Sequence, residues 1–241
     1  ASIVCDLIYG FPYQDMAVWE DDVKTASELP LDGVDCYQLN VFEKSPLGKF
    51  IANGKLPAGA DKAMRSEMFA RSIEILSQAQ WRRLSNNHWG RTFRERNLYN
   101  RFGKSSADCL AFGCGAGGKI HGYSFMMERK LDEWEKQIQE GIKPIAFATA
   151  PTANWHTLRT ISSEMELGRI NMQALGRHFD LPLAELSKDV FDQWTEAGLL
   201  TPQGPWHVQT VAGQFWHVTM SQLLMNVLGF RLKHENAAKF F

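Results

Sequence analysis

The sequence predicts an α/β protein whose first part contains parallel strands and whose last part is mainly helical. Residues 2–9 are apolar and β-branched, residues 15–28 place apolar side chains at helical spacing, and residues 34–42 are apolar again. Strand, helix and strand at this spacing indicate a β–α–β unit, in which the two strands run parallel. From residue 162 onward, helical segments, a Gly-Leu-Leu turn, a short strand and a final helix follow one another in the order of a winged-helix unit.

The composition is that of a globular protein. The chain has 241 residues, of which 44% are hydrophobic and 22% charged, so one or two domains with a buried core are expected. The net charge of −1 excludes a general electrostatic attraction to nucleic acid or to an anionic membrane surface. The sequence has no apolar run long enough to cross a bilayer. Four cysteines fit a reducing compartment, so we expect a cytoplasmic protein with neither nucleic acid nor membrane as a partner.

Several elements of the first part can be placed by their boundary residues. The strand at residues 2–9 ends at Gly10, and the helix at residues 15–28 begins with a capping aspartate, Asp15. The further expected elements are a loop at residues 44–60, a helix from Asp61 to about Ala79, a weak strand at residues 81–84 and a short buried strand at residues 107–112.

The second part reads as a series of helices. A polar helix from Glu128 to Glu140 is expected to end at Gly141. The other expected elements are helices at residues 162–177, 182–186 and 187–197, a turn around residues 202–205, a strand at residues 206–210 and a last helix from about residue 213 to 228. The predicted domains are residues 1–125 and 145–241, with residues 126–144 as a connecting helix.

A glycine-rich loop, Gly113-Cys114-Gly115-Ala116-Gly117-Gly118, follows the expected strand at 107–112. Its glycines satisfy G-x-G-x-x-G, but a dinucleotide-binding loop must open a helix, and residues 119–125 are glycine-broken and aromatic. Two other interpretations are a tight turn, and a place where the backbone approaches some other cofactor because no Cβ keeps the ligand away.

The segment from Arg82 to Lys104 is strongly basic and aromatic. It holds seven basic residues against one acid, Glu95, and five aromatic rings, counting His88, alternate with the charges, with Trp81 just before the segment. Such a segment fits nucleic acid, or a flat apolar ligand whose carboxylates bind arginine, or a solvated surface loop. These three interpretations remain open at the level of residue chemistry.

Local motifs do not define a reaction. The cysteines are Cys5, Cys36, Cys109 and Cys114, and no pair has the C-x₂-C spacing of a zinc or redox site. We therefore expect them in the core or in turns. The histidines form no H-E-x-x-H pair, and nucleophile-elbow, P-loop and kinase motifs are absent from the sequence.

An ordered set of segments resembles the oxygen-independent coproporphyrinogen dehydrogenase family of radical S-adenosylmethionine (SAM) enzymes. The resemblance covers nearly the whole chain. Its segments are residues 6–12, 37–39 with 46–48, 87–91, 113–117, 197–200 and 210–213. Within that family, the amino-acid sequence of three segments is most similar to the haem-utilisation branch: residues 113–118, 122–126 and 213–216.

This resemblance implies a fold, a reaction and partners. The fold would be the later half of a partial (β/α) radical-SAM barrel followed by a winged-helix-like C-terminal domain. The parent enzyme would use SAM and a 4Fe–4S cluster to methylate haem, open the macrocycle anaerobically and release iron. A flavodoxin-type protein would supply electrons. The alternatives are a coproporphyrinogen III dehydrogenase-like enzyme and a non-catalytic haem carrier.

The resemblance also assigns roles to particular residues. Asp6 matches an acid that contacts SAM, and Asn40 matches a position beside SAM at the end of the next strand. Gly115 and Gly117 match a turn whose backbone approaches SAM. His88 and Arg91, in the basic and aromatic segment, are the expected contacts to haem or a related tetrapyrrole. No catalytic residue and no metal ligand is assigned within this chain.

One departure from the family is large. The C-x₃-C-x₂-C motif, whose thiolates hold the cluster, is absent, and the four cysteines are separated by 31, 73 and 5 positions. The chain also begins at Ala1 with strand-like sequence. We therefore expect it to be the C-terminal portion of a longer protein, without the radical chemistry when alone.

Overall fold

The structure, a computed structural model, describes residues 1–238 and divides them into two compact units. The first unit contains residues 1–97, 198–201 and 209–217, and the second contains residues 98–197, 202–208 and the chain from residue 218 onward. The N-terminal stretch of the first unit thus stops at Asn97, and the unit is completed by two segments from later in the chain. The limit expected for the first domain was residue 125. The division into domains at residues 125 and 144 stays a prediction.

A four-stranded sheet forms the centre of the first unit. It contains β1 (Val4–Tyr9), β2 (Gly33–Gln38), β3 (Arg82–Arg83) and β4 (His88–Gly90), in the order β1-β2-β4-β3. The pair β1–β2 is parallel, as the β–α–β pattern predicted, and β4 is antiparallel to both of its neighbours.

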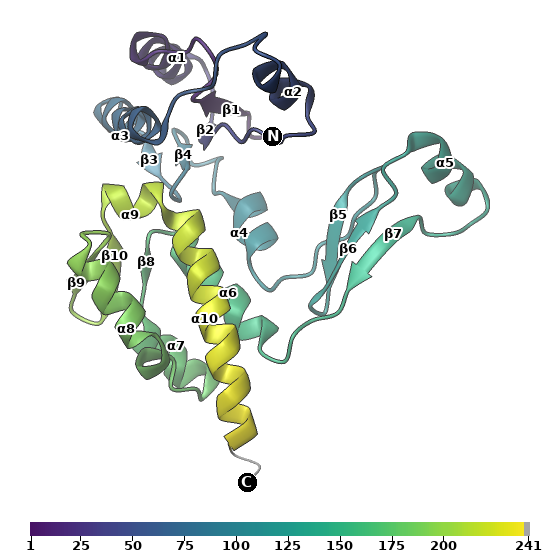
Figure 1. The fold of residues 1–241 in the computed structure, drawn as a ribbon, viewed down its shortest axis with the longest axis vertical. Coiled ribbons are helices and arrows are strands. Elements are labelled where there is room, and N and C mark those ends of the chain that lie inside the picture. The colour runs from purple at the N-terminus through teal and green to yellow at the C-terminus, as the bar shows by residue number, and fades with distance from the viewer. Residues whose placement is uncertain (239–241) are drawn as a thin grey trace. The chain divides into compact units, whose positions relative to one another are not determined.

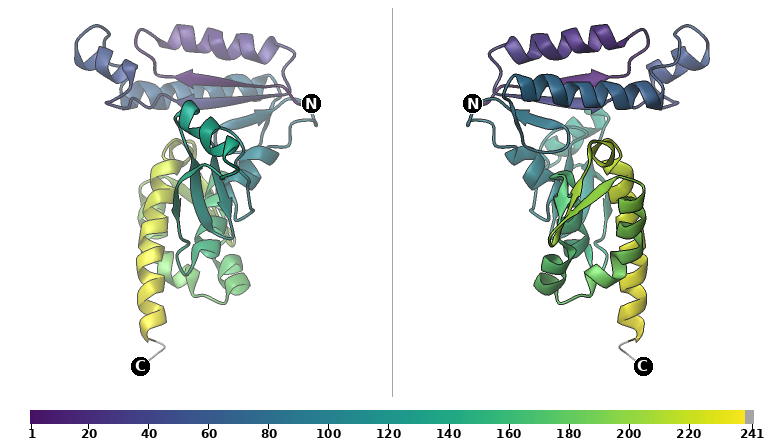
Figure 2. Two further views of the ribbon diagram at one scale, coloured as in Figure 1. Left: turned by 90° about the vertical axis from the view of Figure 1, so that its right-hand side faces the viewer. Right: turned by 90° about the vertical axis from the view of Figure 1, so that its left-hand side faces the viewer.

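Two helices cover one face of this sheet. α1 (Met16–Glu28) and α3 (Lys62–Gln78) lie alongside β1 (Figures 1 and 2), and each begins at its expected cap, Asp15 or Asp61. Trp19 is fully buried between them, and its indole N–H donates to the backbone carbonyl of Met68 at 2.7 Å. A cap oxygen satisfies an otherwise unpaired N–H of the first turn, which is why these boundaries could be predicted.

The segment expected to be a loop at residues 44–60 contains a short helix, α2 (Pro46–Ala52). Ser45 caps it by accepting from the backbone N–H of Gly48 at 3.0 Å, and Pro46 occupies the first helical position. The Ser-Pro pair is a start signal for a helix, because proline lacks only an N–H that would have no partner there.

The second unit begins with α4 (Leu98–Lys104) and an antiparallel sheet of β5 (Gly117–Ile120), β6 (Tyr123–Met127) and β7 (Ile145–Thr149). The strand expected at residues 107–112 is wrong, since only Cys109 pairs with a strand residue there, Lys119. The glycine-broken segment after the glycine-rich loop forms the hairpin instead. His121 and Gly122 both have positive φ, 49° and 81°, as a two-residue hairpin turn requires.

The remaining elements are mostly helical. The expected helix 128–140 is present as α5 (Leu131–Gln139), whereas the single helix expected at residues 162–177 is two helices, because the chain turns at Gly168 with φ +80°. The helices predicted at 182–186 and 187–197 are one helix. The elements in order are α6 (Trp155–Glu166), β8 (Arg169–Ile170), α7 (Met172–Phe179), α8 (Leu183–Glu196), β9 (Leu200–Gln203), β10 (Trp206–Gln209), α9 (Val211–Phe215) and α10 (His217–Ala238).

The short strands β8, β9 and β10 form a third sheet in the order β8-β10-β9. The turn expected around residues 202–205 and the strand expected at 206–210 are both confirmed, as β10 follows β9 after two residues. None of the helices in the described residues combines the length and the apolar character needed to cross a membrane.

Candidate functional site

In the first unit, one face of the sheet is not covered by helices, and titratable side chains lie on that face. Cys5, Leu7 and Tyr9 of β1 pack into the core with α1 and α3. Because side chains alternate along a strand, Asp6 points to the opposite face together with its neighbours Val4 and Ile8, which are 38% and 40% exposed. We call this side the helix-free face.

Three polar residues form a row across the helix-free face. The strand register places Asp6 of β1 opposite Asp35 of β2, and Asp35 opposite His88 of β4. On β2 and β4, the neighbouring residues Val34 and Trp89 belong to the core on the other side. We call Asp6, Asp35 and His88 the polar row. Asp6 is exposed, whereas the other two are only 5% and 3% exposed.

His88 lies between two carboxylates. Its Nδ1 is 2.8 Å from Oδ2 of Asp35, and its Nε2 is 3.1 Å from Oε1 of Glu95. These contacts are ion pairs rather than well-aligned hydrogen bonds. Glu95 is itself held by the hydroxyl of Ser2, which donates to Oε2 at 2.7 Å. A Cβ on Gly33 would lie 2.8 Å from Cγ of Glu95, so a glycine is needed there for Glu95 to cover the row.

The electrostatics of the row favour a charged histidine beside an accessible carboxylate. Burial alone lowers the pKa of His88, but the carboxylates of Asp35 and Glu95 outweigh it and raise that pKa above its ordinary value. Burial, together with the charge of Asp35, raises the pKa of Asp6, and His88 opposes this effect. Among the described residues the carboxylate of Asp6 has neither a hydrogen bond nor an ion pair, so its oxygens are available to a ligand with N–H or O–H donors.

The predicted contact Asn40 lies near the same edge of the sheet as the end of β1. It follows β2 by two residues and is exposed, and the N–H of Leu39 just before it donates to the carbonyl of Tyr9 at 2.9 Å. Ligands of α/β proteins collect at the carboxyl ends of parallel strands, and Asn40 occupies this position.

The predicted glycine contacts belong to the second unit. Gly115 has φ +69°, and its N–H donates to the carbonyl of Glu128 at 2.7 Å. Gly117 begins β5, and a Cβ added there would meet only the end of Met126, at 3.8 Å. The four predicted cofactor contacts are therefore divided between the units, with Asp6 and Asn40 in the first and the two glycines in the second.

The predicted tetrapyrrole contacts do not form a visible site. His88 is enclosed by carboxylates, and the guanidinium of Arg91 donates to the carbonyl of Leu29 at 2.7 Å. Other arginines of the basic segment are also bonded within the protein. Arg82 donates to the carbonyl of Thr92 at 2.8 Å, and Arg83 donates to the carbonyl of Asn86 at 2.6 Å. The role of His88 and Arg91 towards a tetrapyrrole stays a prediction.

Sequence reasoning missed Asp35 and Glu95. Asp35 could have been found, because the apolar residues Val34 and Cys36 on either side must face the core and so direct the aspartate to the other face. Glu95 was marked in the sequence only as the one acid of the basic segment, and that segment has no regular periodicity from which its contact with His88 could be predicted. Its position depends on the path of that loop over Gly33.

The described residues do not fit an iron–sulfur cluster. They contain no group of three or more histidine, cysteine, aspartate or glutamate side chains able to hold a metal. All four cysteines are free, with Cys5 and Cys36 on neighbouring strands of the first unit and Cys109 and Cys114 in the second. The exposed carboxylate of Asp6, in contrast, fits a ligand with several N–H or O–H donors, such as SAM.

Comparison with known proteins identifies the relatives of the chain. No family model matches it. The chain is 39% identical over 233 residues to an anaerobilin synthase from Escherichia coli O157:H7, and the match covers 95% of this chain and 50% of that protein. The chain is a relative of anaerobilin synthase.

The fold of this anaerobilin synthase relative is also found in a solved structure. Coproporphyrinogen III oxidase from Escherichia coli, described as a radical SAM enzyme, matches with a TM-score of 0.72 at 19% identity. The match covers 93% of this chain and 55% of the oxidase, so the chain spans about half the length of both proteins. The sequence match confirms the resemblance to the haem-utilisation branch of the coproporphyrinogen dehydrogenase-like family, and the structural match confirms the mixed α/β fold class.

Proposed function

We propose that the parent protein is a radical SAM enzyme that methylates haem, opens its macrocycle without oxygen and releases iron. The observation that carries this proposal is the 39% identity to an anaerobilin synthase over 95% of the chain. The chain would contribute the later strands of the barrel and the C-terminal part, and would be inactive alone because its cysteines do not form a cluster site.

The residues of this chain would bind and orient SAM. A 4Fe–4S cluster held elsewhere in the parent would supply the electron that makes SAM a source of a carbon radical. Asp6 would accept hydrogen bonds from SAM, because its carboxylate is exposed and has no partner within the described residues. Asn40 would contact SAM from the adjacent strand end, and Gly115 and Gly117 would approach it through their backbone.

His88 of the polar row would help to keep Asp6 ionised. Burial, together with the buried carboxylate of Asp35, raises the pKa of Asp6 and so disfavours its ionised form. The positive charge of His88 opposes this effect, and Glu95 holds the other ring nitrogen of His88 in place at 3.1 Å. His88 is thus proposed as a positioning residue for the SAM contact.

The C-terminal part is proposed to be winged-helix-like, and the domain limits to be residues 1–125, 126–144 and 145–241. The order α6, β8, α7, α8, β9, β10 and the sheet order β8-β10-β9 support the first of these proposals. Residues 187–228 contain one lysine and no arginine, so binding of nucleic acid through this part is not expected. A cytoplasmic location and a flavodoxin-type electron donor complete the proposal.

A second candidate function is coproporphyrinogen III dehydrogenase-like chemistry. The fold match to coproporphyrinogen III oxidase, with a TM-score of 0.72, favours it. At 19% identity this match shows a shared fold, whereas the closer sequence match is to the anaerobilin synthase.

Anaerobic turnover of the full-length parent with haem, SAM and a reductant tests the proposal. The haem Soret band should disappear, and mass spectrometry should detect a methylated linear tetrapyrrole and free iron. If coproporphyrinogen is consumed while the Soret band of haem persists, the alternative function is correct. If haem binds but SAM is not consumed with either substrate, the parent is a haem carrier and both proposals are wrong.

A further inference from the structure

Two adjoining cavities in the second unit share an arginine. An apolar cavity of about 720 Å³ lies by Tyr99, Phe102 and Phe147, and a polar cavity of about 400 Å³ lies by Ser105, Thr149 and Gln222. Lys119, Ser124 and Arg159 line both. The volume of the apolar cavity is in the range of small-molecule sites, roughly 300–1,000 Å³.

The two shared cations are not equivalent. The ammonium of Lys119 donates to the carbonyl of Gly103 at 2.8 Å and also to those of Phe102 and Ser105, so it is occupied by the end of α4. Within the part of the chain that the structure describes, the guanidinium of Arg159 forms no hydrogen bond and no ion pair. Arg159 is therefore the cation available to a ligand at the junction of the cavities.

The acid nearest to this arrangement is already engaged. Asp108 also lines the apolar cavity, and its Oδ1 accepts from the backbone N–H of His121 at 2.8 Å. The two cations lie close together where the cavities meet. Burial lowers the pKa of Lys119, and the nearby charge of Arg159 lowers it further. The junction thus favours an anionic group.

Exposed aromatic rings surround the apolar cavity. Tyr99 is 86% exposed, Phe102 59% and Phe147 56%. Rings gathered around one cavity form the kind of exposed apolar patch that marks a binding surface. An ion pair between Lys104 and Glu166, at 2.7 Å, joins α4 to α6 and so holds the first two rings opposite the helix that carries Arg159.

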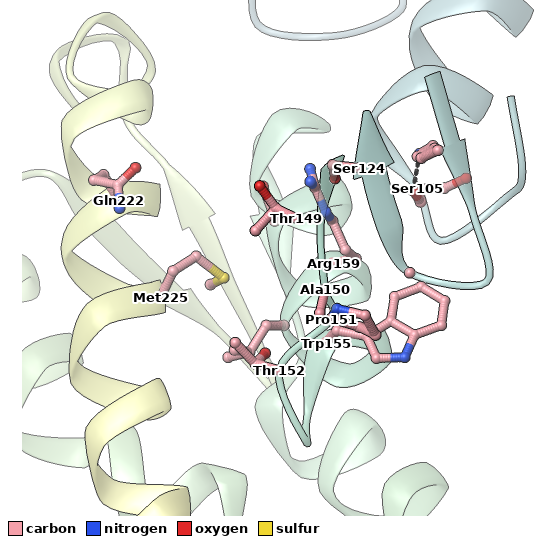
Figure 3. A pocket seen from close by; sticks show the side chains of 14 residues that line it. Ser105, Ser124, Thr149, Ala150, Pro151, Thr152, Trp155, Arg159, Gln222 and Met225 are labelled. Carbon is pink, nitrogen blue, oxygen red and sulfur yellow. Dashed lines mark hydrogen bonds between the residues drawn. The ribbon is translucent and has the colours of Figure 1, made fainter. Parts of the chain in front are cut away.

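Polar groups continue the site beyond the guanidinium. In Figure 3 the side chain of Arg159 extends from α6 towards the strands that carry Ser124 and Thr149. A planar guanidinium binds a carboxylate through two parallel hydrogen bonds, and hydroxyl groups nearby can donate further bonds.

We propose that these cavities bind a flat, apolar ring ligand that carries a carboxylate, with the ring among Tyr99, Phe102 and Phe147 and the carboxylate on Arg159. The ligand class rests on the proposed function, in which it is the tetrapyrrole substrate with its propionates. The basic and aromatic segment thus contributes two rings, whereas the cation comes from a residue outside that segment.

Titration of the full 241-residue chain with protoporphyrin IX and with its dimethyl ester tests the site. Arg159→Gln should weaken binding of the diacid by about tenfold, as expected for one lost charge-assisted contact. Binding of the diester should change less than twofold in the same variant. The matched control is Arg177→Gln, which removes an exposed arginine of α7 in the same unit and should leave both affinities unchanged.

The proposal is wrong if Arg159→Gln and Arg177→Gln bind the diacid equally well, or if neither they nor the unmodified chain binds it. A second variant, Phe147→Ala, should weaken binding of both the diacid and the diester, because it removes ring contact rather than charge. If it changes neither affinity, the ring does not lie in this cavity.

Failure of this inference can be told apart from failure of the proposed function. If the full-length parent consumes haem with the same KM in the Arg159→Gln variant, the function stands and the site is wrong. If the parent does not consume haem but the chain binds the diacid through Arg159, the site stands and the reaction is different.

Discussion

Nδ1 of His88 lies 2.8 Å from Oδ2 of Asp35, and both side chains are buried on the helix-free face of the first-unit sheet. The contact joins the antiparallel neighbours β2 and β4, and the same register places Asp6 on the other side of Asp35. A charged pair in such a position is costly to break, because the remaining partner stays buried without its counter-ion.

The pair predicts a pH dependence of stability. The pKa of His88 is raised in the folded protein, so its contribution is complete below about pH 6.5, the ordinary value, and is lost as the pH rises through the folded pKa. His88→Asn should cost about 3 kcal/mol of unfolding free energy near pH 6 and less at pH 8.5. Urea unfolding at several pH values measures this difference. His178→Gln, at an exposed histidine, should follow the unmodified chain at every pH.

Asp6→Asn should separate binding from stability. The pKa of Asp6 is raised in the folded protein, so its ionised form destabilises the fold above the unfolded pKa of about 3.9. The amide should therefore increase the free energy of unfolding at pH 7, by less than about 1 kcal/mol because the side chain is exposed, and should have no effect near pH 3.

The same variant in the full-length parent should raise the KM for SAM. Asp21→Asn, at an exposed aspartate of α1, is the control and should leave that KM unchanged. If Asp6→Asn leaves the KM for SAM unchanged, Asp6 does not contact SAM.

Gly117→Ala tests the backbone approach of SAM without disturbing the fold. An added Cβ would lie 3.8 Å from the end of Met126, which is an ordinary contact, so thermal unfolding should be unchanged. A methyl group between the backbone and SAM should raise the KM for SAM in the parent, by about tenfold or more. Gly113→Ala is the matched control, since a Cβ there has nothing within 4 Å. Equal KM values for the two variants would exclude the contact.

Trp19→Phe should destabilise the first unit. The change removes the hydrogen bond to the carbonyl of Met68 and leaves a cavity between α1 and α3, at a combined cost of about 2 kcal/mol. Val18→Ala, at the neighbouring position that is 47% exposed, should cost much less. Urea unfolding followed by circular dichroism compares the two, and similar values would show that the indole is not a principal core contact.

Much of the fold followed from local sequence. The caps Asp15 and Asp61 fixed two helix starts, and the alternation of apolar residues in β1 and β2 fixed which side chains enter the core. The expected strand at 107–112 failed because a short apolar run does not distinguish a strand from an extended loop. The hairpin was missed because its glycines read as interruptions, although Gly122 is what allows the turn.

The sequence by itself determined the α/β class, the main caps and the likeness to radical SAM enzymes, because these depend on neighbouring residues and on ordered motifs. It also named Asp6 and His88. Only the tertiary structure decided that Asp35 lies between them, because strand register brings together residues that are far apart in the chain. Arg159 depends in the same way on the packing of α6 beside β5, β6 and β7, which no local pattern specifies.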